Sequence, residues 1–131
     1  MGRCRAMAMT LKEIAHALVD GCKTGKEAEN LDALYAPDAV SVEAMAMAPG
    51  GSPETHGIDG IKGKHAWWES AFEFLGGSIE GPYLHGADRF AVVFKVQTRN
   101  RETGAVDAME EVGVYHVKDG KIVREEFFYT M

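Results

Sequence analysis

Acidic side chains gather in the last third of the sequence, where apolar and polar residues alternate as they do in β-strands. Glu110 and Glu111 are neighbours in one such segment. Because successive side chains of a strand point to opposite faces, only one of the two can enter a pocket. Glu125 and Tyr129 share a face of the final segment. Carboxylates gathered in one apolar site raise one another's pKa and can supply an acid and a base.

The same acidic residues also have a purely structural interpretation. Arg89 and Arg99 lie in a neighbouring predicted strand and Arg124 lies in the final one, and ion pairs between neighbouring strands are common. A Glu111 or Glu125 that is paired with one of these arginines would have no chemical role. The sequence leaves both interpretations open.

Several other kinds of chemistry have no signal here. The five histidines are not spaced as metal ligands. The glycines match neither a phosphate-binding loop nor a dinucleotide-binding fingerprint, and there is no Gly-x-Ser-x-Gly motif. We therefore expect no metal and no cofactor.

Three stretches of the sequence have helical spacing, and the helices that they predict must pack against the strands that carry these residues. A capping box at residues 10–13 begins a first helix that should end near Cys22. A second, short helical stripe from Leu31 to Tyr35 is closed by Pro37. Asp59 caps a third helix, which we expect to continue to Leu75 before two glycines end it.

Strands follow, most of them consecutive in the chain. Residues 40–43 form a short first strand, and residues 44–57 form a long loop. From residue 78 onward the apolar residues recur at every second position, which predicts strands at 78–85, 89–99, 106–117 and 121–129. Phe90, Val92 and Phe94 share one face of the second of these. Helices followed by consecutive antiparallel strands indicate an α+β domain.

Size and composition limit the partners. The chain has 131 residues, of which 46% are hydrophobic and 26% charged, so we expect one globular domain over residues 10–131 after a flexible tail at 1–9. A net charge of -6 disfavours nucleic acid and anionic membranes. The sequence shows no signal peptide and no membrane-spanning stretch, and its two cysteines predict no disulfide. We expect a cytoplasmic protein.

Three short phrases carry a family resemblance. They are Leu-Tyr-Ala-Pro-Asp-Ala-Val at 34–40, Gly-Ile-Asp-Gly-Ile at 57–61 and Lys-Asp-Gly-Lys-Ile-Val-Arg-Glu at 118–125. In this order and separation they resemble the SnoaL-like and ketosteroid-isomerase-like branch of the NTF2-like superfamily, over residues 10–129. The resemblance implies a cystatin-like cone, in which three helices from the N-terminal half pack on a curved mixed or antiparallel sheet around an apolar pocket.

The resemblance also implies roles for particular residues. Glu43 falls where ketosteroid isomerases place the carboxylate that abstracts a proton, and Glu111 faces inward together with Met109, Gly113 and Tyr115. Leu18 and Gly113 stand where those isomerases have two oxyanion donors, which disfavours steroid isomerisation. The expected catalytic set is Glu43, Glu111, Glu125 and Tyr129. The expected pocket lining is Tyr35, Met45, Trp68, Phe72, Phe94, Met109 and Phe127.

Two functions remain open at this point. The first is a cofactor-free isomerase, cyclase or hydrolase that acts on a small apolar or amphipathic molecule by carboxylate acid-base catalysis. The second is a noncatalytic ligand-binding or dimerising domain, because fold alone does not determine function. The resemblance also implies a homodimer formed through the outer sheet face, to which we expect some of the apolar residues Ala91, Val93, Val112 and Val114 to contribute.

Overall fold

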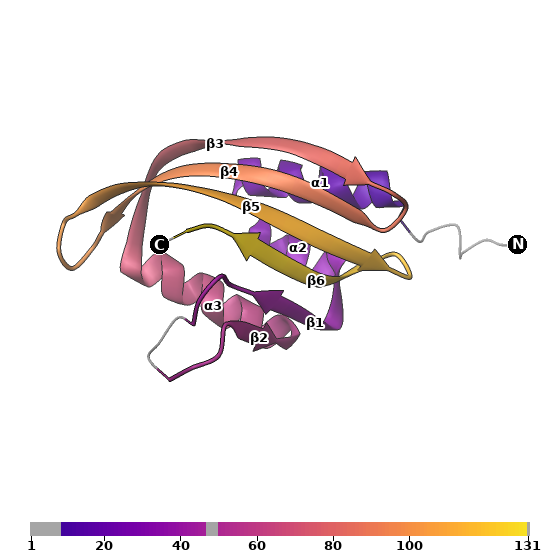
Figure 1. The fold of residues 1–131 in the computed structure, drawn as a ribbon, viewed down its shortest axis with the longest axis horizontal. Helices are drawn as coiled ribbons and strands as arrows, with labels where there is room; N and C mark the ends of the chain where they lie inside the picture. The colour runs from indigo at the N-terminus through magenta and orange to yellow at the C-terminus, as the bar shows by residue number, and fades with distance from the viewer. Residues whose placement is uncertain (1–8, 47–49, 131) are drawn as a thin grey trace, which may run out of the picture.

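The computed structural model describes residues 9–46 and 50–130, so most of the expected tail and Met47 of the long loop lie outside it. The helices are α1 (Leu11–Thr24), α2 (Glu27–Leu34) and α3 (Gly57–Ala71). The strands are β1 (Tyr35–Val42), β2 (Glu54–His56), β3 (Phe72–His85), β4 (Arg89–Asn100), β5 (Val106–Lys118) and β6 (Lys121–Phe128). Together they form the expected α+β fold, with three helices packed on one sheet (Figure 1).

The sheet has six strands in the order β2-β1-β6-β5-β4-β3. Only the pairing of β1 with β6 is parallel, so the sheet is mixed. Figure 1 shows the long strands β3, β4 and β5 curving past α1 and α2, whereas α3 lies beside β1 and β2. The inner face of the sheet, which we define as the face covered by the helices, therefore encloses the interior of a cone.

The core lies between this inner face and the helices. The predicted alternation of β4 is confirmed, because Phe90 and Val92 are fully buried and Phe94 packs against the core. The ring of Phe90 stacks on Tyr115 of β5, with ring centroids 4.9 Å apart. Each large side chain buried in this way contributes about 1.5–3 kcal/mol to stability. The core residues are Ile14, Ala15, Leu18, Val19, Leu31, Leu34, Tyr35, Ala39, Ile61, Phe90, Val92, Tyr115 and Ile122.

The predicted start of the first helix is confirmed. The Thr10 hydroxyl accepts a hydrogen bond from the Glu13 backbone N–H at 3.2 Å, and the Glu13 carboxylate accepts one from the Thr10 N–H at 2.9 Å. These bonds satisfy backbone donors that the first turn leaves free. The helix ends at Gly25, whose φ of 75° is readily adopted by glycine.

Two predicted helix ends were wrong, and both errors have the same cause. The third helix stops at Ala71 because β3 begins at Phe72, which pairs with Asn100 of β4. Tyr35 begins β1 instead of ending a helix, and it pairs with Ile122 of β6. At both positions, hydrogen bonds to strands that lie far away in the sequence override the local helical spacing.

Three smaller differences concern the strands. The loop at 44–57 contains β2, which pairs with β1 at residues 40–42. The β3 strand begins at Phe72 instead of at residue 78, and its register shifts between Glu80 and Tyr83. In β6, Ile122 is fully buried and Val123 is not, because an irregularity in the pairing between β5 and β6 changes the register there.

Candidate functional site

A group of polar side chains lies buried inside the cone. β1 carries Ser41 on its inner face, and the chain just beyond it supplies Glu43. β6 supplies Glu125, which pairs with Ser41 across the parallel ladder. The inner side of α3 supplies Lys64, three residues after the buried Ile61. None of these four side chains is more than 9% exposed, so the polar group is shielded from water.

Glu125 is held by two hydroxyl groups. The Tyr35 hydroxyl donates to its Oε1 atom, and the Ser41 hydroxyl donates to its Oε2 atom at 2.6 Å. Ser41 in turn accepts a hydrogen bond from the Lys64 ammonium. Burial and the neighbouring Glu125 raise the pKa of Tyr35 well above its usual value, so its hydroxyl remains a donor.

Lys64 also contacts Glu43, which accepts hydrogen bonds from two side chains. Lys64 Nζ lies 2.7 Å from Glu43 Oε2, and the Tyr129 hydroxyl donates to Glu43 Oε1 at 2.9 Å. Burial and this hydrogen bond raise the pKa of Tyr129 to about 12. One connected chain of hydrogen bonds therefore runs from Tyr35 through Lys64 to Tyr129. We call it the interior network; its members are Tyr35, Ser41, Glu43, Lys64, Glu125 and Tyr129.

Glu111 lies beside this network but is not hydrogen-bonded to it. It stands on the inner face of β5 opposite Phe94, as its predicted orientation requires. Burial raises the pKa of its carboxyl group to about 7, and the charge of Glu43 adds to the increase while that of Lys64 opposes it. Near neutral pH this carboxyl group is divided between its protonated and ionised forms.

The arginine pairs considered from the sequence form with other carboxylates. Arg89 lies 3.5 Å from Asp88, Arg99 lies 3.0 Å from Glu73, and Arg124 lies 3.5 Å from Glu126. Within the described part of the chain, none of the three forms an ion pair with Glu111 or Glu125. The ordinary structural interpretation of these two glutamates therefore loses its support.

A pocket of about 460 Å³ opens at the ends of β1 and β6. Its lining includes Glu43, Phe127 and Tyr129, so it reaches one end of the interior network. Deeper in the cone, the rings of Phe94, Tyr115 and Phe127 converge on Gly113, where an added Cβ would lie 3.1–3.2 Å from all three. Gly113 therefore leaves the space in which these rings meet.

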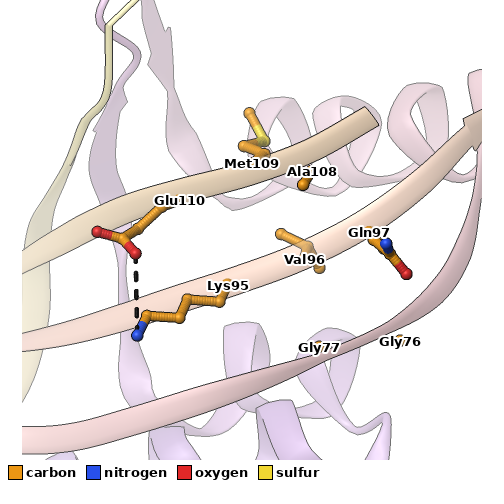
Figure 2. A pocket seen from close by; sticks show the side chains of 8 residues that line it. All are labelled: Gly76, Gly77, Lys95, Val96, Gln97, Ala108, Met109 and Glu110. Atoms are coloured by element: carbon orange, nitrogen blue, oxygen red, sulfur yellow. Dashed lines mark ion pairs between the residues drawn. The ribbon is translucent and has the colours of Figure 1, made fainter. Parts of the chain in front are cut away.

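A second hollow, of about 400 Å³, lies elsewhere on the sheet, against β3, β4 and β5 (Figure 2). Among its lining residues, Lys95 and Glu110 alternate with the inner-face residues Phe94 and Glu111, so they belong to the opposite, outer face. The nitrogen of Lys95 lies 3.9 Å from Glu110 and 3.1 Å from Glu80. The acidic and basic side chains at this hollow pair with one another, and they are exposed to water.

The expected lining residues are spread over several places. Phe94 and Phe127 pack at the edge of the core, and Tyr35 is buried in it as a support for Glu125. Trp68 and Phe72 pack together, with ring centroids 4.7 Å apart, at the end of α3. The other two, Met45 and Met109, differ in position: Met45 is 41% exposed, and Met109 borders the second hollow.

Sequence reasoning did not identify Lys64 or Ser41, although both left a signal. Lys64 stands three residues after Ile61 and four before Trp68, in the middle of an apolar helical stripe. A lysine that is fully buried at such a position is rare unless it is paired. Ser41 is two residues from both Ala39 and Glu43, so it shares a face of the first strand with them. A charged or hydroxyl side chain on a face that must be buried needs a partner.

Two further classes of site can be addressed from the described residues. Residues 9–46 and 50–130 contain no group of three or more His, Cys, Asp or Glu side chains that could hold a metal ion. Over the same residues, no helix has the length and apolar character needed to cross a membrane.

The fold and its polar interior place the protein in a known class. Similar solved structures carry NTF2-like, ketosteroid-isomerase-like and cystatin-like folds. The chain belongs to the SnoaL-like domain family, whose sequence model matches residues 9–129. No curated protein matches the sequence.

Three solved structures illustrate the similarity. A Mesorhizobium loti protein, provisionally named a SnoaL-like polyketide cyclase with "carbohydrate phosphatase" added in brackets, is 40% identical, with a TM-score of 0.84 over 92% of this chain and 100% of that one. A provisionally named isomerase from Bacillus subtilis is 18% identical, with a TM-score of 0.68 over 91% and 85%. A Catenulispora acidiphila protein in complex with trimethylamine is 20% identical, with a TM-score of 0.69 over 94% and 88%.

Proposed function

We propose that this protein is a cofactor-independent enzyme that moves a proton on a small, largely apolar carbonyl compound by carboxylate acid-base catalysis. The observation that carries the proposal is the half-buried Glu111, whose pKa is raised to about 7 beside the interior network. A general acid-base group works best when its pKa lies near the working pH. The proposed reaction class is therefore an isomerase or a cyclase that uses such a group.

The buried charges of the interior network also support a functional role. Taking Lys64 and Glu43 out of water is costly, and a well-packed apolar pair of similar volume is often at least as stable. The ion pair nevertheless lies with both side chains less than 8% exposed. Buried charges beside a carboxyl group of shifted pKa are typical of active sites.

The proposed reaction needs no external reactant. Ionised Glu111 takes a proton from the carbon next to the carbonyl group, and the electrons of that C–H bond move onto the carbonyl oxygen to form an enolate. Where the substrate also has a C=C bond between its β- and γ-carbons, the enolate is a dienolate, and protonated Glu111 then returns the proton to the γ-carbon, which moves the C=C bond into conjugation with the carbonyl group. Alternatively, the enolate carbon attacks a second carbonyl group of the same molecule and closes a ring, and the new alkoxide takes up the proton.

The other expected catalytic residues have supporting roles in this scheme. Glu43 and Tyr129 border the pocket of about 460 Å³ and are joined by a hydrogen bond, so both can orient a ligand there. Glu125 is held by two hydroxyl groups deeper inside and fixes Ser41 beside Lys64. The name of the Mesorhizobium loti relative, a provisional cyclase, agrees with the ring-closing version.

Proton exchange tests the proposal without knowledge of the natural substrate. Small cyclic ketones and 1,3-diketones would be incubated with the protein in deuterated water, and loss of the C–H signal would be followed by NMR. We expect faster exchange for some of these compounds, and Glu111→Gln should slow it by about 10²- to 10⁴-fold, the usual contribution of a general base. Glu110→Gln, the same change on the outer face, is the matched control.

A clear failure is possible. If compounds bind in the cone, as seen by chemical-shift changes at inner-face residues, but exchange no faster than in buffer, the acid-base proposal is wrong. Equal exchange by wild-type protein and Glu111→Gln would remove Glu111 from the mechanism.

The second candidate function is that of a noncatalytic, dimerising domain, and the outer sheet face supports it. Ala91, Val93, Val112 and Val114 are only half-buried there, and Phe128 beside Val112 is 54% exposed. Sedimentation at tens of micromolar should show a dimer for wild-type protein and a monomer for Phe128→Glu. A monomeric wild-type protein would contradict the association role.

A further inference from the structure

We infer that Lys64 is the oxyanion-binding residue of this site, and that the substrate is therefore an uncharged carbonyl compound whose oxygen becomes negative during the reaction. This inference rests on the proposed function and assigns a residue and a substrate class to it. Leu18 is buried in the apolar core, and Gly113 has no side chain, so neither position can stabilise an enolate with a side chain. A different donor must act in this cone.

The argument begins with the donor protons of Lys64. An ammonium group has three N–H bonds. One is directed to Ser41 Oγ and one to Glu43 Oε2, and both acceptors are fixed by further hydrogen bonds. Within residues 9–46 and 50–130, no other residue accepts a hydrogen bond from Lys64. One donor therefore remains available in a site that excludes water.

Phe127 lies next to both the ammonium group of Lys64 and the pocket. Lys64 Nζ lies 5.2 Å from the centre of the Phe127 ring. Phe127 is part of the lining of the 460 Å³ pocket, together with Glu43 and Tyr129. Lys64 does not itself line the pocket, but Phe127 and Glu43 do, and both lie against its ammonium group. In the proposed complex a ligand oxygen reaches the ammonium group by displacing the Phe127 ring.

The surrounding charges define the substrate class. Lys64 is faced by Glu43 after β1, by Glu125 of β6 and by Glu111 of β5, with the neutral hydroxyls of Tyr35 and Tyr129 at the two ends of the network. The single ammonium is outnumbered by carboxylates, so a ligand that brings two negative charges, such as a phosphate ester, would be repelled. A neutral carbonyl compound enters without that penalty, and its oxygen gains charge only when Glu111 has taken the proton.

Lys64 is held in one orientation by this arrangement. It forms an ion pair with Glu43 at 2.7 Å and is fixed at two acceptors. A charged ammonium is a hydrogen-bond donor and not a nucleophile, so the geometry favours electrostatic stabilisation over a covalent imine.

Binding of 3,4-dinitrophenol tests the inference, because its anion is a planar, stable mimic of an enolate and its protonation is visible by absorbance. Titrations would be made below the pKa of Glu111, where that carboxyl group is protonated. We expect the phenolate to bind to wild-type protein with a lowered pKa. In the double variant Lys64→Met/Glu43→Gln, which keeps the net charge and leaves no unpaired carboxylate, affinity should fall about 10- to 100-fold.

Control variants separate charge from packing. Lys62→Met removes an exposed lysine of the same helix, which pairs with Asp32, and should leave phenolate binding unchanged. Lys64→Arg keeps the charge and should retain most of the binding. The neutral analogue 3,4-dinitrotoluene should bind equally to wild-type protein and to the double variant. Inorganic phosphate should not compete.

Several results would overturn the inference. They are equal phenolate affinity in wild-type protein and the double variant, an unchanged pKa of the bound phenol, competition by inorganic phosphate, or an imine between Lys64 and a ketone trapped by borohydride. Failure of the proposed function would look different. In that case proton exchange would be absent from the wild-type protein although Lys64 still bound the phenolate.

Discussion

Glu110 and Glu111 are adjacent on β5, and the contrast between them shows how burial alters the chemistry of a side chain. Glu110 points to the outer face, where its side chain is 66% exposed and 3.9 Å from Lys95 (Figure 2). Glu111 points into the cone, where burial raises its pKa to about 7. One residue type at two consecutive positions thus gives an ordinary surface charge and a candidate acid-base group. The difference follows from the pleat of the strand alone.

Lys95 and Lys64 show the same contrast between an exposed and a buried position, here for a basic side chain. Lys95 and its partner Glu80 are both nearly half exposed, and their ion pair spans 3.1 Å. Lys64 and Glu43 are both almost fully buried, and their pair spans 2.7 Å. Water screens the outer pair and solvates either partner if the other is lost, whereas it solvates the almost fully buried partners of the inner pair only poorly. The comparison therefore predicts unequal responses to the same substitution.

Lys64→Met should produce the largest change. It leaves the carboxylate of Glu43 buried without its cation, and such a loss typically lowers the free energy of unfolding by about 3–5 kcal/mol. Urea unfolding would measure the effect. Lys95→Met is the matched outer-face control, and its unfolding midpoint should stay close to that of wild-type protein.

The double variant Lys64→Met/Glu43→Gln sharpens this prediction. It removes both charges, so it should recover most of the stability lost in Lys64→Met. A double variant as unstable as the single one would mean that Lys64 acts through its packing and not through its charge.

Glu111→Gln should change how stability depends on pH. In the unfolded chain Glu111 loses its proton near pH 4.5, whereas in the folded protein it keeps the proton up to about pH 7. Between these values the folded state binds more protons, so its stability falls as the pH rises. The Glu111→Gln variant has no carboxyl group at this position, so it does not lose stability in this way. Its stability relative to wild-type protein should therefore rise by about 2–3 kcal/mol from pH 4.5 to above pH 7.

Thermal or urea unfolding at several pH values would measure this difference. Because both proteins share all other titrating groups, the comparison isolates Glu111. Glu110→Gln carries the same substitution on the outer face. Identical pH profiles for the two variants would contradict the assigned environment of Glu111.

The sequence predicted this contrast better than it predicted the elements around it. The pleat alone requires Glu110 and Glu111 to lie on opposite faces, and the alternation of Phe90 and Val92 identified the inner face correctly. The end of the third helix was wrong, since Phe72 follows Trp68 at helical spacing but pairs with Asn100, 28 positions further along the chain. No local pattern contains that pairing.

Lys64 shows a different limit. Its position in the apolar stripe was visible, but its partners come from β1 and the segment just after it, more than 20 residues earlier in the chain. A lysine there could equally have extended along the helix to reach water. Only the packing of α3 against β1 determines that it turns inward and completes the network.

Tyr129→Phe should give the smallest effect of the series. The change removes the hydrogen bond to Glu43 Oε1 but leaves the ion pair with Lys64, and Tyr129 stands at the partly open end of the network. Water can replace the lost hydroxyl, so we expect a loss of only about 1 kcal/mol in the free energy of unfolding. Tyr83→Phe, at a residue that is 54% exposed, is the control and should be close to neutral. A loss from Tyr129→Phe as large as that from Lys64→Met would show that water does not reach Glu43 from the pocket, and that the pocket is closed at the point where a substrate would have to enter.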